Sequence, residues 1–551
     1  MKETLEAIIK QKVREIYGLE IENFTIEKPK DDNLGDLATN VAFLLSKKLR
    51  RDPKSLAQQM AEHLGNEEFS AEAVGGFINF TFSDDYLKRE FTELLRKGEA
   101  YFVEDMGKGE SLQVEFVSAN PTGPLHLGHG RGAVVGDVLA NLLKTYGYKV
   151  VREYYINDAG YQVYLLGLSI LYKYKKLFGE EDEQLKDVYE REGYKGKYID
   201  ELAKDVKAFY GSSLLKEDRD KAINLLKDYG VKRLLEEIKS TLELLNIRFD
   251  VWYSEKALYL EGKVQKVVNL LKERGYTYEK DGALWFKSTE FGDDKDRVLI
   301  RSDGTYTYFA GDIAYHWGKY QRGFSKVINI WGADHYGYLP RLKGALTALG
   351  IPENWLNVQL VQMVRLFSEG QEIRMSKRTG EFITLKELIE DVGSDAVRFV
   401  FLTKRSDTPL DFDIELIKRK TSENPVFYVQ YMHARIMGVF REVHTRYQMD
   451  IDKEYLQTFV PFLKESQEIK LIKRVLFLKD NIKEAVLRLH PHIITYELLD
   501  LAKDFHSYYN HYRVILEDRN TMLSRIALLK GIELSVKFGL KLMGVGAPDR
   551  M

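Results

Sequence analysis

One segment near residue 120 limits most strongly how this chain can fold. An apolar, strand-like run from Leu112 to Val117 leads into Pro124-Leu125-His126-Leu127-Gly128-His129, and a helical pattern follows from Arg131 to Tyr146. A helix N-terminus supplies amide donors and a positive dipole end, which together favour a bound anion. The segment therefore predicts a nucleotide-binding βα unit in which His126 and His129 contact phosphates.

A second, cationic segment lies far downstream. It reads Arg374-Met375-Ser376-Lys377-Arg378-Thr379-Gly380 and follows Gly370. A loop lysine can stabilise the charge that develops on a pyrophosphate leaving group. Two surface histidines and a solvated loop are the ordinary alternatives for the two segments taken singly. Their order in the chain, with further strands between them, favours ATP activation.

Length and composition limit the class of protein. A chain of 551 residues is too long for one core and should form about three or four domains. It contains no cysteine, which excludes disulfides and thiolate-held metals, and we expect no structural metal. No stretch approaches the ~20 apolar residues that cross a bilayer. We therefore expect a cytoplasmic protein without a membrane partner.

The order of strands and helices predicts an α/β fold. Between residues 108 and 415, strand patterns at Lys149–Tyr155, Lys326–Trp331 and Val358–Val364 alternate with helices. This alternation is typical of a doubly wound parallel sheet of the Rossmann-like kind. Charged helical segments and a hairpin at Lys280-Asp281-Gly282 interrupt it, which indicates an insertion at about 161–295. A second hairpin at Ser302-Asp303-Gly304 precedes Tyr308.

The ends of the chain form two further predicted domains. Residues 1–107 have the pattern of a small α+β unit, and residues 416–551 that of an α-helical bundle. The bundle segment has 22 Lys and Arg against 16 Asp and Glu, a net charge of +6, and six of the eleven histidines. Such a surplus indicates a surface that meets phosphates, although an inert basic bundle fits the charge count equally well.

Polar residues gather where the predicted strands end, which is where ligands bind in doubly wound sheets. Four carboxylates in this setting would suit a cationic ligand, and a planar guanidinium fits best because it donates in pairs. A helix cap or a surface charge is the alternative for each one alone. The residues are Glu115, Ser118, Asn120, Glu255, Tyr308, Asp312, Asp334 and His335.

The run from Val114 to His129 resembles the signature of the arginyl-tRNA synthetases, which belong to the class I aminoacyl-tRNA synthetases. The resemblance spans essentially the whole chain. It extends to Asn33–Asn40, Gly75–Phe80, Tyr155–Gly160, Trp331–His335 and Met543–Pro548. It implies ATP-dependent attachment of L-arginine to its tRNA through an arginyl-adenylate, with release of AMP and pyrophosphate.

The resemblance also implies roles for individual residues. His126, His129 and Lys377 would be catalytic, in a loop where Arg374 and Arg378 depart from the family consensus. Further ATP contacts would be Pro124, Gly128, Gly332, Asp334, His335, Met375 and Ser376. Arginine would be held by Glu115, Ser118 and Asn120 near its α-amino group, by Glu255, Tyr308 and Asp312 at its guanidinium, and by Asp334.

The implied partners are arginine tRNA, L-arginine, and ATP with Mg²⁺, and we expect a monomer. The N-terminal unit would touch the outer corner of tRNA, through Phe77 and Asn79. The bundle would bind the anticodon, with about half of its candidate aromatics expected in the core instead. These candidates are Tyr428, Tyr431, Tyr508, Tyr509, His511 and Arg513. Another class I synthetase, a non-catalytic tRNA-binding relative and a small nucleotidyltransferase remain alternatives.

Overall fold

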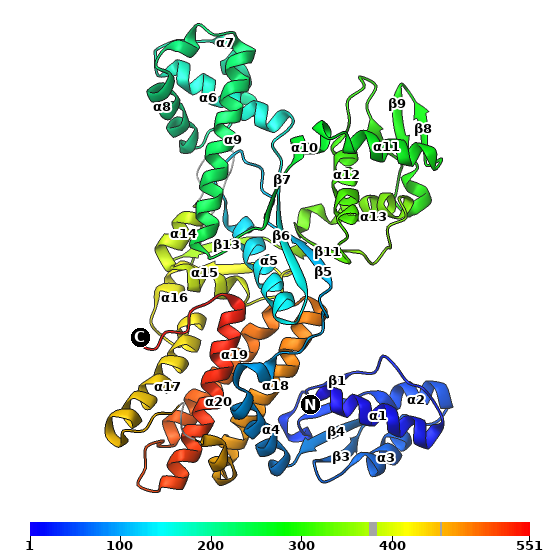
Figure 1. Cartoon of the computed structure of the whole chain (residues 1–551), viewed down its shortest axis with the longest axis vertical. Helices are drawn as coiled ribbons and strands as arrows, with labels where there is room; N and C mark the ends of the chain where they lie inside the picture. Colours follow the sequence, from blue (N-terminus) through cyan, green and yellow to red (C-terminus); the bar gives the residue numbers. More distant parts are fainter. Residues whose placement is uncertain (374–382, 452–454) are drawn as a thin grey trace.

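Figure 1 shows the computed structural model of the chain, which describes residues 1–373, 383–451 and 455–551, without the side chain of Asp32. The predicted lysine loop, with Met375, Ser376 and Lys377, lies outside the described residues. The described chain extends from an N-terminal domain and a helical bundle, through a central sheet, to two lobes beyond that sheet (Figure 1).

The N-terminal domain packs three helices against a four-stranded antiparallel sheet. Helix α1 buries Leu5, Ile9 and Val13, and α3 begins with Asp52 as its cap and proline in its first turn. The elements are α1 (Lys2–Tyr17), α2 (Val41–Leu49) and α3 (Pro53–Leu64), with strands in the order β1 (Ile26–Glu27), β2 (Leu37–Thr39), β4 (Phe77–Phe82) and β3 (Phe69–Val74). The sequence pattern over residues 36–50 predicts one helix, but residues 37–39 form a strand because they pair with β4.

The central sheet is fully parallel and confirms the predicted doubly wound fold. Its order is β12 (Leu356–Val361), β11 (Lys326–Gly332), β5 (Ser111–Glu115), β6 (Lys149–Ile156) and β7 (Val251–Ser254). Helix α5 (Leu127–Thr145) connects β5 to β6 and is buried along most of its length. The strand order reverses between β5 and β11, and a ligand crevice is expected outside the carboxyl ends of these two strands.

Strand β7 lies inside the segment that the sequence predicted as one insertion. It pairs with β6 at the edge of the sheet, so the interruption at about 161–295 consists of two separate excursions. The first is a helical lobe of α6 (Tyr161–Lys176), α7 (Glu183–Glu192), α8 (Lys197–Tyr210) and α9 (Arg219–Leu244). The second contains α10 (Glu255–Leu260), α11 (Lys263–Glu273), β8 (Thr277–Lys280), β9 (Ala283–Phe286) and β10 (Arg297–Ile300).

The second lobe confirms both predicted hairpins. Asp281 and Gly282 have φ of 51° and 73°, the two positive values that a tight two-residue turn between β8 and β9 requires. The next turn brings Tyr306 into a bridge with Ile300. Helix α12 (Tyr308–Gln321) follows directly, and α13 (Leu339–Ala348) follows β11.

A small mixed sheet lies between the central sheet and the bundle in the chain. The predicted strand over 358–364 divides at residues 362–363, where the buried Arg131 donates to the carbonyl of Gln362 at 3.1 Å. The elements are β13 (Val364–Ser368), β14 (Gln371–Ile373), α14 (Leu385–Val392), α15 (Ser394–Phe401), β15 (Leu410–Asp413) and α16 (Ile414–Lys418).

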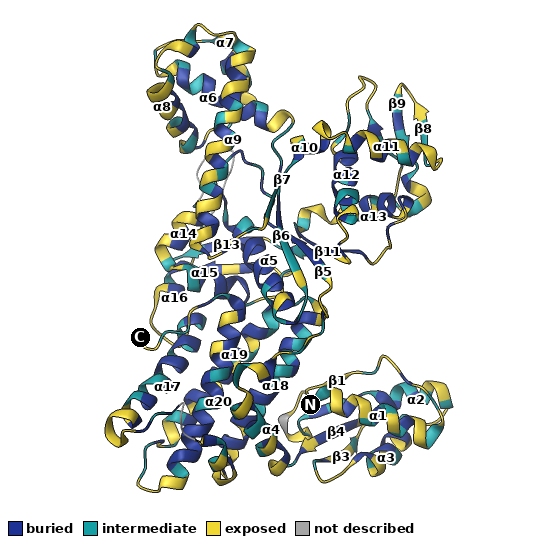
Figure 2. Ribbon diagram, in the orientation of Figure 1, coloured by how far each residue is buried: buried dark blue, intermediate teal, exposed yellow. Residues whose placement is uncertain are grey.

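The C-terminal bundle confirms the helical prediction. It contains α17 (Pro425–Tyr447), α18 (Ser466–Arg488), α19 (His492–His511) and α20 (Arg519–Met543), and Figure 2 shows that the faces between them are buried. Helix α4 (Asp84–Lys97) is capped by Ser83, a residue type that favours this position, and packs on the bundle through the fully buried Phe91. Within the described residues, no helix is long and apolar enough to cross a membrane.

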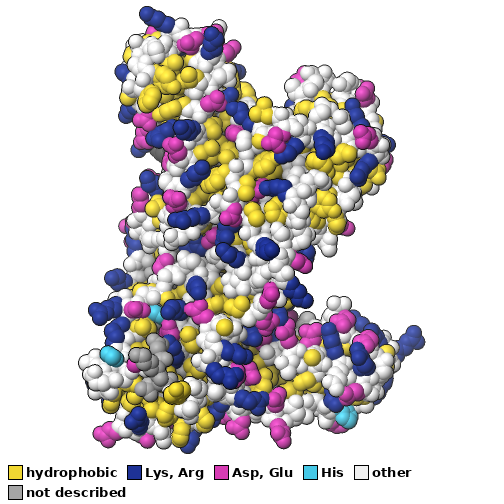
Figure 3. All heavy atoms as spheres, viewed as in Figure 1, with side chains coloured by type: hydrophobic (Ala, Val, Ile, Leu, Met, Phe, Trp, Pro, Cys, Tyr) yellow, Lys and Arg dark blue, Asp and Glu magenta, His cyan; other side chains and the backbone are white. Residues whose placement is uncertain are grey.

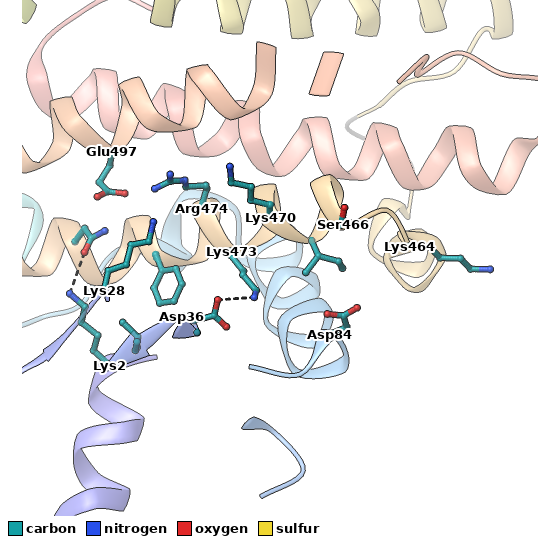
Figure 4. Close-up of a pocket in the computed structure, with 15 residues that line it drawn as sticks. Lys2, Lys28, Asp36, Asp84, Lys464, Ser466, Lys470, Lys473, Arg474 and Glu497 are labelled. Atoms are coloured by element: carbon teal, nitrogen blue, oxygen red, sulfur yellow. Dashed lines mark hydrogen bonds and ion pairs between the residues drawn. The ribbon is translucent and has the colours of Figure 1, made fainter. Parts of the chain in front are cut away.

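The N-terminal domain meets α18 across a polar groove, drawn in Figure 4. Lys473 Nζ lies 2.7 Å from Asp36 Oδ1, and a cavity of about 560 Å³ opens beside this pair. Lys470 pairs with Asp504 at 2.7 Å on the bundle side. The lining of the groove has six Lys or Arg side chains against three Asp or Glu side chains, and the groove lies at the contact between the N-terminal domain and the bundle.

The contact between α4 and α20 leads to a test of the packing. A Cβ added to Gly531 would lie 2.3 Å from Phe91 Cζ, whereas one added to Gly438 on α17 would meet only the end of Arg441, at 3.7 Å. We expect Gly531→Ala to destabilise the protein by about 1–3 kcal/mol through overpacking. Gly438→Ala, the matched control, should be neutral or stabilising by up to about 1 kcal/mol. Calorimetric melting of both variants measures the difference. Equal changes in melting temperature would contradict the close contact between Gly531 and Phe91.

Candidate active site

The two histidines predicted to contact phosphates form a capping box at the start of α5. His126 is the N-cap, and its Nδ1 accepts from Gly128 N at 3.2 Å, while His129 Nδ1 accepts from His126 N at 3.4 Å. Their rings stack with centroids 3.6 Å apart. A Cβ at Gly128 would lie 3.1 Å from His126 Cε1, so the glycine allows this approach. Both imidazoles are thereby fixed at the positive end of a buried helix.

The chain that follows the undescribed residues 374–382 is attached to this same motif. Leu385 N donates to Leu125 O at 2.8 Å, and Thr384 forms a bridge with His126. Thr384 and Glu387 form the capping box of α14. The segment immediately after the predicted lysine loop is therefore fixed beside the histidines.

A strained turn follows β5. Val117 and Ser118 have φ of 67° and 39°, in the left-handed region that costs roughly 1–3 kcal/mol for such residues. Ser118 Oγ donates to Glu115 Oε1 at 2.9 Å and accepts from Tyr155 N at 3.1 Å. These two bonds hold Ser118 at the strand end, close to Asn120, whose amide donates to Gln162 at 2.5 Å.

Two carboxylates predicted to hold a guanidinium lie near enough for the charge of Asp312 to act on Glu255. Glu255 is buried in the first turn of α10, and its Oε1 lies 4.0 Å from where a Cβ on Gly311 would stand, next to Asp312. The hydroxyl of Tyr338 donates to Asp312 Oδ2. Among the described residues, neither carboxylate has an ion pair with lysine, arginine or histidine.

The electrostatics of this pair follow from burial and mutual repulsion. Burial above all, and then the charges of Asp312 and Asp158, raise the pKa of Glu255 to about 7. Burial raises the pKa of Asp312 to about 6, against the lowering effect of the hydrogen bond from Tyr338. Two adjacent carboxylates with raised pKa values form a site that a cation would stabilise.

The third predicted guanidinium contact, Tyr308, lies at the mouth of the crevice. Its side chain is about half exposed, and its hydroxyl would lie 2.9 Å from a Cβ at Gly160, where φ is 85°. Asn157 is a further polar residue near this site, and no sequence motif predicted a role for it. In the amide orientation that satisfies its neighbours, Asn157 donates to Glu255 Oε2 at 2.7 Å. Its position directly after β6, another strand end, was the available signal.

The nucleotide contacts predicted after β11 lie on the open side of the crevice. Asp334 and His335 are exposed, with 3.6 Å between Asp334 Oδ2 and His335 Nε2. They occupy the short 3₁₀ segment η5 (Ala333–Tyr338). A Cβ at Gly332 would lie 2.4 Å from Asp334 Oδ1, which is the end of an exposed side chain that can move aside. In the part of the chain that the structure describes, no three His, Cys, Asp or Glu side chains could hold a metal ion.

The predicted tRNA contacts divide into surface and core residues. Phe77 is exposed, but Asn79 is buried in β4 and Tyr508 is buried with its hydroxyl 3.1 Å from Glu468, so these two side chains are not available to a partner. The guanidinium of Arg435 lies 4.7 Å and 4.9 Å from the ring centroids of Tyr431 and Tyr509. Tyr428 packs on His506, while His511 and Arg513 are exposed.

The surface shown in Figure 3 bears charges of both signs. Over the bundle, Lys and Arg side chains are interspersed with Asp and Glu side chains in this view (Figure 3). The surplus of six positive charges in residues 416–551 therefore forms no single basic patch on this face.

Comparison with family models agrees with this architecture. Residues 90–413 match the model described as tRNA synthetases class I (R), catalytic domain, and residues 429–551 match the DALR anticodon binding domain. Residues 3–82 match the arginyl tRNA synthetase N terminal domain. The doubly wound sheet, the histidine capping box and the first of these matches, over more than half of the chain, define a class I aminoacyl-tRNA synthetase.

Whole-chain relatives define the family. The chain is 55% identical to the arginine–tRNA ligase of Aquifex aeolicus over 100% of both sequences. It is 43% identical to that of Bacillus subtilis over 100% of this chain and 99% of the relative. The solved arginyl-tRNA synthetase of Thermus thermophilus shares the fold at a TM-score of 0.77, with 22% identity and both chains fully covered. The chain belongs to the arginyl-tRNA synthetase family.

The raised pKa of Glu255 predicts a pH-dependent stability. Between its unfolded value near 4.3 and its folded value of about 7, the folded state binds more protons, so stability falls as pH rises through this window. We expect Glu255→Gln to raise the free energy of unfolding by roughly 1–3 kcal/mol at pH 8 and to change it little at pH 4.

Melting curves at the two pH values measure this gain. Glu279→Gln, which replaces an exposed carboxylate on β8, serves as the matched control and should leave the melting temperature unchanged at both. A Glu255→Gln variant that is no more stable than the wild type at pH 8 would contradict the raised pKa.

Proposed function

We propose that the crevice between β5 and β11 carries out the reaction of the family through the residues described above. The protein is an arginine–tRNA ligase, which attaches L-arginine to tRNA with consumption of ATP. In the first step the arginine carboxylate attacks the α-phosphate of ATP, and arginyl-adenylate and pyrophosphate form. In the second step the terminal adenosine hydroxyl of tRNA attacks the acyl carbon, and AMP leaves.

Recognition of the guanidinium rests on Glu255 and Asp312. The observation that carries this assignment is that burial raises the pKa of both carboxylates, with the charge of Asp312 acting on Glu255, and that neither has a cationic partner among the described residues. A guanidinium can donate to both carboxylates from one plane, which an ammonium cannot do. Tyr308 would close the open side of the pocket, and Asn157 would orient Glu255.

The α-amino group would bind at the strained turn after β5. Ser118 and Asn120 offer oxygen atoms there, and both are fixed by hydrogen bonds to neighbours. Both carboxylate oxygens of Glu115 are already engaged, by Ser118 and by the buried Lys319. Glu115 would therefore act through Ser118, and the exposed Asp334 would complete the polar contacts from the β11 side.

ATP would lie over the N-terminus of α5. Pro124 and Gly128 let the backbone approach the triphosphate, and His126 and His129 would hold it, with Gly332 and His335 on the opposite side. Met375, Ser376 and Lys377 would contact it from the lysine loop. Mg²⁺ would enter as the counter-ion of ATP. The chemistry requires positioning and charge stabilisation rather than a general base.

The tRNA would meet the N-terminal domain and the bundle. The exposed Phe77 is retained as a contact, and the bundle candidates are Tyr428, Tyr431, Tyr509, His511 and Arg513. The stack of Arg435 between Tyr431 and Tyr509 supports base recognition there, because single-stranded bases stack on such surfaces. A monomeric state, a cytoplasmic location and domain boundaries near 107 and 415 stay predictions.

Amino-acid specificity tests the function. In pyrophosphate exchange with each of the twenty amino acids, with and without tRNA, we expect exchange with arginine and tRNA only. A pocket with unpaired hydrogen-bonding groups rejects ligands that lack the partner groups by roughly 10⁴–10⁵. Comparable exchange with any other amino acid would contradict the assignment of the pocket.

The lysine loop gives a separate prediction. Lys377→Ala should slow adenylate formation at saturating tRNA by about 10²–10³-fold, because the developing charge on pyrophosphate loses one donor. Arginine affinity, measured by equilibrium binding, should change little. Lys386→Ala on α14 is a nearby control for the loss of a lysine. An unchanged activation rate in Lys377→Ala would remove Lys377 from the catalytic set.

A further inference from the structure

Helix α12 presents a row of polar side chains to the central sheet. The row begins at Asp312 and continues at intervals of three or four residues, so its members lie along the side that faces the strands. They are Tyr315, His316, Lys319 and Arg322. Each contacts a polar residue of β5, β6 or β11. Tyr315 and Arg322 donate to Glu153, His316 Nε2 meets Asn329, and Lys319 contacts Glu115 and Asn329.

Lys319 is the most deeply buried of these groups. Its side chain is fully buried, and Nζ lies 2.5 Å from Glu115 Oε2 and 3.1 Å from Asn329 Oδ1. The ring centroid of Tyr315 is 4.4 Å away. A buried ammonium is tolerated only where its partners hold it closely, so this pair specifies one position of α12 on β5.

The contact continues from Glu115 to the active-site turn. The second oxygen of Glu115 accepts from Ser118 Oγ at 2.9 Å, and Ser118 has the left-handed backbone that requires such support. Lys319 thus reaches, through one carboxylate, the turn that carries the proposed α-amino contacts.

The same helix carries the opposite end of the arginine site. Asp312 lies seven residues before Lys319, about 10 Å along the helix axis. The charges of Glu115 and Lys319 both act on the pKa of Asp312, the first raising it and the second lowering it. One rigid helix therefore connects the α-amino site to the guanidinium site.

We propose that Lys319 is a positioning residue for arginine. Its ion pair with Glu115 sets the spacing between the turn at Ser118 and the carboxylate of Asp312. It also cancels the charge of Glu115, so the guanidinium is drawn to Asp312 and Glu255. This inference rests on the proposed function. It identifies the ion pair between Lys319 and Glu115 as the contact that fixes the distance between the two ends of the arginine site.

The test is a cycle of variants assayed for tRNA charging. Lys319→Met keeps an unbranched side chain but leaves Glu115 charged and unpaired, and we expect the KM for arginine to rise at least about tenfold. The KM for ATP should stay within about twofold. The double variant Glu115→Gln with Lys319→Met has no buried charge and still accepts from Ser118, so it should recover most of the loss.

The results of this variant cycle distinguish the proposal from its alternatives. Rescue by the double variant, with Lys326→Met on the exposed start of β11 as an inert control, supports the proposal. If Lys319→Met does not fold, the comparison starts from Glu115→Gln instead. That single variant should raise the KM for arginine, and the double variant Glu115→Gln with Lys319→Met should have a lower KM than Glu115→Gln alone. Additive effects, or equal changes in the KM for arginine and for ATP, would overturn the proposal. A wild type that charges no arginine would instead refute the proposed function.

Discussion

The burial of two neighbouring carboxylates, Glu255 and Asp312, is the constraint on which the rest of the site depends. Bringing two carboxylates together away from water is unfavourable, and the shift in the pKa of Glu255 to about 7 corresponds to roughly 3 kcal/mol. Glu255 lies in the first turn of α10, where a helix N-terminus favours negative charge, and Asp312 accepts a hydrogen bond from Tyr338. A planar cation bound between them would recover the lost stability as binding energy.

The rest of the site keeps the proposed arginine contacts at a fixed distance from the proposed ATP contacts. Helix α12 is fixed on the sheet by buried polar contacts, and α5 by its apolar core and by the capping box of His126 and His129. Helix α5 follows β5, and α12 contacts both β5 and β11, the two strands between which the strand order reverses. Rigid secondary structure at this point can hold an amino acid and a nucleotide at the distance that in-line attack requires.

Much of this arrangement could be predicted from local sequence signals. The βα unit with His126 and His129, the Asp281-Gly282 turn and the helix capped by Ser83 depend on residues close together in the chain, so short-range patterns reveal them. The carboxylates at strand ends were also predicted, because a parallel sheet brings those ends to one edge.

Other features depend on contacts that sequence spacing does not reveal. Strand β7 has only four residues of intermediate burial, and it is identified by its pairing with β6. Asn79 and Tyr508 are of residue types that often contact a partner at a surface, but both side chains are buried. Lys319 has the sequence context of an ordinary helical lysine, and its partner Glu115 lies 204 positions away in the chain.

The central claim is most directly tested by counting protons when arginine binds. With pKa values of about 7 and about 6, Glu255 and Asp312 together hold about one proton at pH 6.5, which a bound guanidinium would displace. Calorimetric titration of the tRNA-bound protein with arginine, in buffers of different ionisation enthalpy, measures this number. We expect release of about one proton per arginine at pH 6.5 and of almost none at pH 8.5. Binding at pH 6.5 without proton release would show that these carboxylates do not receive the guanidinium.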